Sequence, residues 1–225
     1  MFADITSANV VGYKNHDLQF GTTIVAPCFV DVGGTDAVDL TKIAPGGDFA
    51  SGEIQISRLD SAGRNIEDYS YDVPRRGTPG WYNMDSGDAV REGDVVFAAG
   101  EGIAVTGNDG LNITSSGEVS TTDRVIALQF GTTLCGNHTA IGLDITSIIP
   151  GGDYASGEIQ ISRLDSAGRN IEDYSFDVPR RGTPGWYNMD TGDAMAEGDL
   201  VFEPGEGFAV TGNDGLTITI LGPTL

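Results

Sequence analysis

Two aromatic pairs are the residues whose type and spacing best suit ligand binding. Each pair contains one of the chain's two tryptophans and directly follows the corner sequence Arg-Arg-Gly-Thr-Pro-Gly. Aromatic rings offer a flat apolar face on which a sugar can stack, and guanidinium groups donate hydrogen bonds beside it. We therefore predict a carbohydrate site at each corner, formed by Trp81, Tyr82, Arg75 and Arg76 and by Trp186, Tyr187, Arg180 and Arg181. The alternative interpretation places the indole rings in the core and pairs the arginines with carboxylates.

An acidic loop follows each aromatic pair. The first runs Asn83-Met84-Asp85-Ser86-Gly87-Asp88, and the second runs Asn188-Met189-Asp190-Thr191-Gly192-Asp193. Carboxylate and amide oxygens are the ligands that Ca²⁺ prefers, but the glycine is displaced from the EF-hand pattern. The same residue types are ordinary turn formers. We therefore predict no cofactor and no assigned metal ligand, with Ca²⁺ as the one ion that these loops would suit.

Little in the sequence points to catalysis. The chain has two histidines, His16 and His138, which are too few for a multi-histidine metal centre, and neither lies in a nucleophile motif such as Gly-x-Ser-x-Gly. Carboxylate pairs are abundant, but a chain with 33 acidic residues brings some together by chance. We expect a protein that is not an enzyme.

The two cysteines, Cys28 and Cys135, do not occupy equivalent repeat positions. Buried free thiols, a bridge within the chain and a bridge between chains are all compatible with the sequence.

Composition and charge exclude other partners. The 225 residues include 33 Asp and Glu against 12 Lys and Arg, a formal net charge of −21. Binding to nucleic acid needs clustered basic residues, so this charge argues against it. No apolar run approaches the roughly 18 residues that a membrane span needs, so we expect no membrane insertion. The hydrophobic share of 39% suits a folded protein rather than an acidic disordered tail.

An internal repeat organises the chain. The stretch ASGEIQISRLDSAGRNIEDYS begins at Ala50 and recurs unchanged at Ala155, an offset of 105 residues. Further upstream, LQFGTT at Leu18 returns at Leu128 with an offset of 110. We predict two tandem homologous domains, residues 1–117 and 118–225, each long enough to bury its own core.

Within a repeat, short alternating segments predict strands separated by turns. Ile54 and Ile56 alternate with polar neighbours, as do Tyr69 and Tyr71. The corner 74–80 holds two prolines and two glycines and cannot lie inside a central strand. Only Asp39–Ile43 and its copy Asp144–Ile148 favour a helical turn. The pattern predicts an all-β protein of two jelly-roll-like β-sandwiches.

Several short motifs resemble a group of exported bacterial proteins. The run 99–105, its copy Pro204-Gly205-Glu206-Gly207-Phe208 and the segment Ser116-Gly117-Glu118-Val119 are similar to that group's "PGEGF…SGEV" repeat ending. Thr6–Tyr13, TSANVVGY, resembles the start of its mature chains, and Phe2-Ala3-Asp4 resembles the end of a signal cleavage site. The resemblance implies export and a β-rich repeat, with no activity to carry over. The second repeat departs from it by ending Leu221-Gly222-Pro223-Thr224-Leu225.

These observations lead to two functional expectations. The first is a secreted or cell-surface structural protein that self-associates head-to-tail into a fibre or surface layer, with residues 9–13 adding as a strand to a neighbouring subunit. The second is a carbohydrate-binding or adhesive module with two equivalent aromatic sites. The expected partners are therefore other copies of the chain or, in the alternative, glycans.

Overall fold

The protein consists almost entirely of short β-strands arranged in several sheets. The computed structural model describes residues 11–30, 37–60, 64–74, 77–165, 169–179 and 182–222. Its only helical elements there are two one-turn 3-10 helices, η1 and η2. This confirms the predicted all-β class, and the presence of several sheets is consistent with a β-sandwich.

Eleven strands and η1 form the N-terminal half, residues 11–119. They are β1 (Val11–Asp17), β2 (Gly21–Val25), β3 (Phe29–Val30), β4 (Ala37–Asp39), η1 (Leu40–Lys42), β5 (Ala44–Gly46), β6 (Gln55–Leu59), β7 (Asn65–Asp72), β8 (Gly80–Asn83), β9 (Val96–Ala98), β10 (Ile103–Gly107) and β11 (Asn112–Val119).

Ten strands and η2 form the C-terminal half, residues 124–222. They are β12 (Arg124–Ala127), β13 (Gly131–Gly136), β14 (Leu143–Asp144), η2 (Ile145–Ser147), β15 (Ile149–Gly151), β16 (Gln160–Leu164), β17 (Asn170–Asp177), β18 (Gly185–Asn188), β19 (Val201–Phe202), β20 (Gly207–Gly212) and β21 (Thr217–Ile220).

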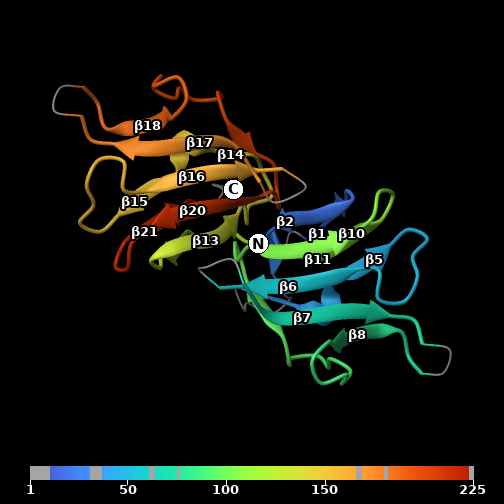
Figure 1. Cartoon of the computed structure of the whole chain (residues 1–225). Coiled ribbons are helices and arrows are strands. Elements are labelled where there is room, and N and C mark those ends of the chain that lie inside the picture. The colour runs from blue at the N-terminus through green and yellow to red at the C-terminus, as the bar shows by residue number, and fades with distance from the viewer. Residues whose placement is uncertain are drawn as a thin grey trace, which may run out of the picture.

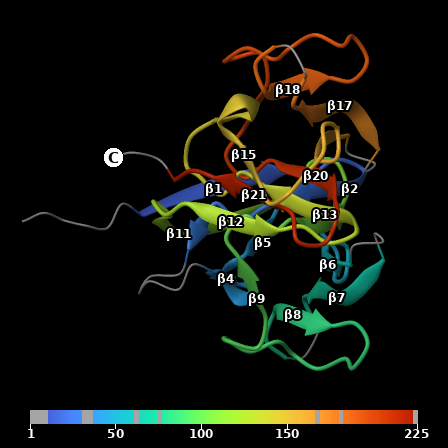
Figure 2. The same cartoon turned by 90° about the vertical axis from the view of Figure 1, so that its left-hand side faces the viewer.

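Each half contains one five-stranded antiparallel sheet backed by smaller sheets. The five-stranded sheets have the orders β2-β10-β6-β7-β8 and β13-β20-β16-β17-β18. Behind them lie β1-β11-β3 with β5 on β11, and β12-β21-β15, together with the pairs β4-β9 and β14-β19. Figure 1 shows the halves side by side, and Figure 2 shows that both five-stranded sheets lie on the same side of the molecule.

Alternation along the strands explains the two layers. Neighbouring residues of a strand face opposite sides, so every second residue can enter the core. The buried apolar residues form two clusters with members at equivalent positions: Ile56, Trp81, Phe97, Val105 and Ile113 in the N-terminal half, and Ile161, Trp186, Phe202, Val210 and Ile218 in the C-terminal half.

The short helical turns lie where the sequence predicts them. Asp39 caps η1, because its carboxylate accepts a hydrogen bond from the Thr41 N–H at 2.7 Å. Asp144 caps η2 in the same way, through Thr146 at 2.8 Å. Aspartate is a preferred residue at such a cap because its side chain satisfies an otherwise unpaired N–H.

The predicted boundary after residue 117 falls inside β11. Glu118 and Val119 continue the strand and pair with Val30 and Phe29 of β3. The strand β11 therefore runs two residues past the predicted boundary. The Gly-Glu-Val segment of the first repeat has no counterpart in the second, where β21 ends at Ile220.

The N-terminal segment expected to reach a neighbouring subunit is paired within its own chain. In β1, Val11, Gly12 and Tyr13 lie opposite Glu118, Gly117 and Ser116 of β11. Residues 9 and 10 lie outside the described residues. A contact between chains through Val11–Tyr13 would therefore require β1 to exchange from one chain to another.

The two halves meet through reciprocal main-chain contacts, which we call the seam. The Ala26 N–H donates to the Gly205 carbonyl at 3.0 Å, and the Gly136 N–H donates to the Gly100 carbonyl at 3.1 Å. Ala26 and Gly136 are equivalent positions of the repeat, as are Gly100 and Gly205. Single bridges between Val25 and Glu206 and between Glu101 and Cys135 repeat the reciprocity. The seam thus has the two-fold character of an isologous interface.

Glycine permits this close approach. A Cβ added at Gly102 would lie 2.7 Å from the carbonyl carbon of Leu134, and one at Gly207 would lie 2.7 Å from that of Ile24. Both obstacles are backbone atoms of the opposite half, which cannot rotate away as a side chain can.

We predict that Gly102→Ala and Gly207→Ala each loosen the seam. Forcing a methyl group against backbone costs about 1–3 kcal/mol. Amide hydrogen exchange at Ala26 and Gly136 should accelerate, because these N–H groups donate across the seam. Gly185→Ala is the control, since a Cβ there meets nothing within 4 Å. Unchanged exchange in both seam variants would contradict the close approach.

Candidate functional site

The two tryptophans lie in the core. Trp81 and Trp186 are each 2% exposed, and their indole N–H groups donate to the carbonyls of Ile43 and Ile148 at 3.0 Å. Trp81 also packs edge-to-face on Tyr71, with ring centroids 5.4 Å apart. The structure therefore corrects the expectation that the indole rings form an open stacking platform. An indole at this position fills core volume and satisfies its one donor locally.

The other predicted corner residues are only partly placed. Tyr82 and Tyr187 are partly exposed, and their hydroxyls donate to the carbonyls of Thr78 at 3.1 Å and Thr183 at 3.3 Å. Arg75, Arg76, Arg180 and Arg181 lie outside the described residues. Glycan binding at the corners stays a prediction, now without stacking on tryptophan.

The acidic loops use their polar groups to hold turns. The Asn83 side-chain oxygen accepts hydrogen bonds from the N–H groups of Asp85 and Ser86 at 3.0 and 2.9 Å. Asn188 does the same for Asp190 and Thr191. Across the described parts of the chain, no three His, Cys, Asp or Glu residues gather in a way that could hold a metal ion.

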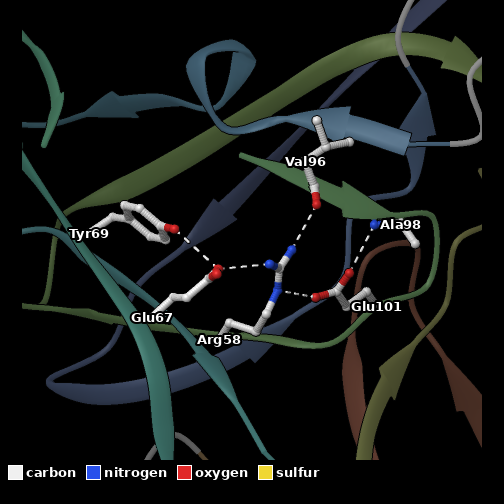
Figure 3. Close-up of polar contacts among 6 residues, drawn as sticks. All are labelled: Arg58, Glu67, Tyr69, Val96, Ala98 and Glu101. Carbon is white, nitrogen blue, oxygen red and sulfur yellow. Dashed lines mark hydrogen bonds and ion pairs between the residues drawn. The ribbon is translucent and has the colours of Figure 1, made fainter. Parts of the chain in front are cut away.

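Each half contains an ion-pair network centred on an arginine, Arg58 or Arg163, that was not among the sites predicted from the sequence. Figure 3 shows Arg58 of β6 between two carboxylates: its Nη1 lies 2.7 Å from Glu67, and its Nε lies 2.6 Å from Glu101. Its Nη2 donates to the Val96 carbonyl at 2.7 Å, and the guanidinium lies 4.8 Å above the Phe97 ring. The planar guanidinium directs separate N–H groups towards these partners and its flat face towards the ring, a geometry that a point-like ammonium group does not offer.

The network also positions the seam. Glu101 accepts a second hydrogen bond, from the Ala98 N–H at 3.0 Å, and so holds the turn that carries Gly100 and Gly102. Arg163 and Glu206 repeat the pairing at 2.8 Å in the C-terminal half. Burial, and then the nearby Glu67 carboxylate, raise the pKa of Tyr69 to about 12, so this hydroxyl stays protonated and donates to Glu67. The sequence Gln-Ile-Ser-Arg-Leu contains a signal for this network. Arg58 lies two residues after the core residue Ile56, at a position where strand alternation predicts an apolar side chain.

Both histidines lie at the seam rather than together in a catalytic arrangement. The His16 ring of β1 lies against Gly205, and His138 lies against Gly100, so each contacts the glycine-containing turn of the opposite half. The His138 Nε2 lies 3.2 Å from the Thr122 carbonyl oxygen. Burial, reinforced by the nearby positive charge of Lys14, lowers the pKa of His16 to about 4.

Both cysteines are free and buried. Burial raises the pKa of Cys28 to about 11 and that of Cys135 to about 12. Because the thiolate is the reactive form, neither thiol is activated as a nucleophile.

Two equivalent clefts flank the seam. One, of about 180 Å³, includes Gln19 and Thr23 from the N-terminal half and Asp165 and Glu206 from the C-terminal half. The other, of about 230 Å³, includes the equivalent Gln129 and Thr133 together with Asp60 and Glu101. Each cleft therefore exists only because the halves are joined, and each lining combines hydrogen-bonding and aliphatic groups.

Comparisons with known proteins give no relative: no family model, no curated protein and no solved structure matches the chain. Within the described ranges, neither helical turn has the length or hydropathy to cross a membrane.

We predict that His16 makes stability depend on pH. The folded chain keeps the ring neutral down to about pH 4, whereas the unfolded chain takes up a proton near its ordinary pKa of 6.5. The contribution of His16 to the free energy of unfolding is therefore complete above pH 6.5. It falls by about 3 kcal/mol as the pH is lowered towards 4.

Urea unfolding at several pH values between 7.5 and 4 measures this effect. His16→Gln is the control, because it keeps a polar side chain that does not titrate. Other groups contribute at low pH, notably Glu53 and Glu158, whose pKa values are lowered by backbone hydrogen bonds from Ala50 and Ala155. Only the difference between wild type and variant reports His16. Parallel pH profiles for the two proteins would rule the effect out.

Proposed function

We propose that the protein is an exported, non-catalytic structural protein that self-associates into an extracellular fibre or surface layer. We further propose that each half is a jelly-roll-like β-sandwich domain and that the two are tandem homologous domains. The observation that carries self-association is a pair of highly exposed phenylalanines at equivalent positions of the two halves.

The core arrangement supports the two-domain proposal. Every named sheet takes its strands from one half, and the two buried apolar clusters separate in the same way. The seam joins the halves mainly through backbone contacts at the glycine-containing turns. Contacts of this kind orient two folded units without merging their cores.

The tryptophans allow the two-domain proposal to be tested. In a Trp81→Phe chain, only Trp186 reports on unfolding, and in a Trp186→Phe chain only Trp81 does. Adding Ile56→Ala removes buried core volume from the N-terminal half, at a cost of about 2–5 kcal/mol. The free energy of unfolding reported by Trp81 fluorescence should fall by that amount, and the free energy reported by Trp186 should change little. Equal shifts of both transitions would show a single cooperative unit and reject the proposal.

Phe20 and Phe130 are the exposed groups that suit self-association. They are 77% and 76% exposed and lie in the two copies of the Leu-Gln-Phe-Gly-Thr-Thr turn. Their N–H groups donate to Asp109 at 2.8 Å and to Asp214 at 2.9 Å, which anchors the backbone that presents each ring. Single exposed apolar residues are common on protein surfaces, but here the same anchored turn presents the same ring twice.

The two-fold seam determines the kind of assembly these rings would form. Because the halves are related reciprocally, each chain offers two equivalent contact points. If each contact point binds one contact point of another molecule, two joined molecules still have a free point at either end. Further molecules can then add, and the result is an open chain of molecules. The net charge of −21 opposes this contact, so association should strengthen as salt screens the repulsion.

We predict that Phe20→Ala with Phe130→Ala abolishes assembly and leaves folding intact. At moderate salt, sedimentation velocity and negative-stain images should show polymers for the wild type and monomers for the double variant. Each single variant should form dimers only, because one contact point remains. As a matched control, Ile66→Ala with Ile171→Ala removes an equally duplicated apolar pair, each 54% exposed, from another part of the surface.

A truncation separates this contact from the head-to-tail contact expected from the sequence. Removing residues 1–10 leaves β1 complete, whereas removing residues 1–15 would take away most of β1 and open the edge of β11. The phenylalanine contact predicts polymers from the truncated chain. Loss of polymers after truncation, with unaltered polymers in the double phenylalanine variant, would instead assign assembly to the N-terminal segment.

A further inference from the structure

A row of uncharged hydrogen-bonding side chains crosses the outer face of each five-stranded sheet. Residues directly opposite each other in antiparallel strands share a face. In the N-terminal half, the strand registers place five such residues in line from β2 to β8: Thr22, Thr106, Gln55, Ser70 and Tyr82. In the C-terminal half, the equivalent row is Thr132, Thr211, Gln160, Ser175 and Tyr187.

Burial shows that these rows face outward. Their in-strand neighbours, such as Ile56 and Val105, enter the core, so the rows lie on the opposite side of the sheet. Ser70 and Ser175 are nearly buried between larger neighbours, and the other eight residues are partly or fully exposed.

The seam brings the two rows onto one surface. Both five-stranded sheets lie on the same side of the molecule, with β2 and β13 nearest the centre and β8 and β18 at opposite ends (Figures 1 and 2). One row therefore runs from Tyr82 inwards to Thr22 and the other from Tyr187 inwards to Thr132, and β2 lies next to β20 across the seam. We call these ten residues the polar face. Thr132 also lines the larger seam cleft, which places a concave site with both polar and aliphatic lining beside the middle of this surface.

None of the ten residues of the polar face is charged. Carboxylates of the same sheet face flank the row serines: Asp68 and Asp72 beside Ser70, and Asp173 and Asp177 beside Ser175. The internal hydrogen bonds of the row use only part of its capacity. Gln55, for example, donates one N–H to the Gly52 carbonyl at 3.1 Å and keeps its amide oxygen, and each hydroxyl retains acceptor lone pairs.

We propose that the polar face binds an extended neutral polysaccharide. Sugar hydroxyls both donate and accept, which matches a row of hydroxyl and amide groups. Strands lie about 4.8 Å apart, and each strand contributes one hydroxyl or amide group to the row. The distance between successive groups is therefore comparable to the length of one pyranose unit. The tyrosine rings at the two ends supply partly exposed aromatic surface for stacking. An anionic polymer would be repelled by the net charge, and an apolar partner would leave the hydroxyl and amide groups unpaired.

The two rows would act together. A chain of sugars that spans the seam contacts both halves, so the second row binds at the high effective concentration set by the first. This site is distinct from Phe20 and Phe130, and the inference does not rest on self-association.

Matched threonine variants test the proposal. Thr106→Ala with Thr211→Ala removes two hydroxyls from the polar face. Thr114→Ala with Thr219→Ala removes two from equivalent positions of β11 and β21 in the backing sheets, on the other side of the molecule. The full-length proteins are compared by sedimentation with insoluble cellulose, chitin and β-1,3-glucan, and by affinity electrophoresis in soluble xylan and glucomannan, with alginate as an anionic polymer.

The expected result is binding to at least one neutral polysaccharide and none to alginate. The polar-face variant should bind at least 10-fold more weakly, the single Thr106→Ala and Thr211→Ala variants should be intermediate, and the backing-sheet variant should equal wild type. Gln55→Ala with Gln160→Ala provides an independent loss from the same row. The proposal is overturned if no neutral polysaccharide binds, if alginate binds best, or if the polar-face and backing-sheet variants behave alike. Loss of polymers rather than of polysaccharide binding in the polar-face variant would identify the face as a contact between chains and would also overturn it.

Discussion

The arrangement of the molecule depends on one constraint, a close approach of backbone to backbone at the seam. In each half a glycine-containing turn lies against the edge strand of the other half, β13 or β2. A side chain at Gly102 or Gly207 would collide with main-chain atoms, so the contact exists only because both copies keep glycine there. Arg58 and Arg163 hold these turns through Glu101 and Glu206. These ion pairs thus help to hold the surfaces through which the halves meet.

The reciprocity of that contact has consequences for function. In an isologous seam the two paired surfaces are already in contact with each other. These surfaces therefore do not join one molecule to the next. It leaves a bivalent unit in which several surface features occur twice, including the exposed phenylalanines, the polar rows and the seam clefts. Bivalence of this kind suits an adhesive or structural role, because two weak contacts by one molecule give strong attachment to a repetitive partner.

The chemistry-bearing residues are mostly engaged in holding the fold. The tryptophans donate to core carbonyls, the loop asparagines cap turns, and burial keeps both thiols protonated and His16 neutral. The side chains that remain available to a binding partner are threonine, glutamine, serine and tyrosine. They form a candidate site because they are aligned across neighbouring strands.

Several features of this protein follow from the sequence by itself. The exact repeat, the alternating segments and the Asp-capped turns determine an all-β chain with two equivalent halves, because period-2 patterning and turn chemistry are local properties. The fate of Trp81 was open, because an aromatic residue after a corner can face either side of a sheet. Only the tertiary structure decided that its ring enters the core, that both histidines meet the opposite half, and that two rows of polar residues form one surface. These outcomes depend on contacts between residues far apart in the chain, whose registers no local pattern encodes.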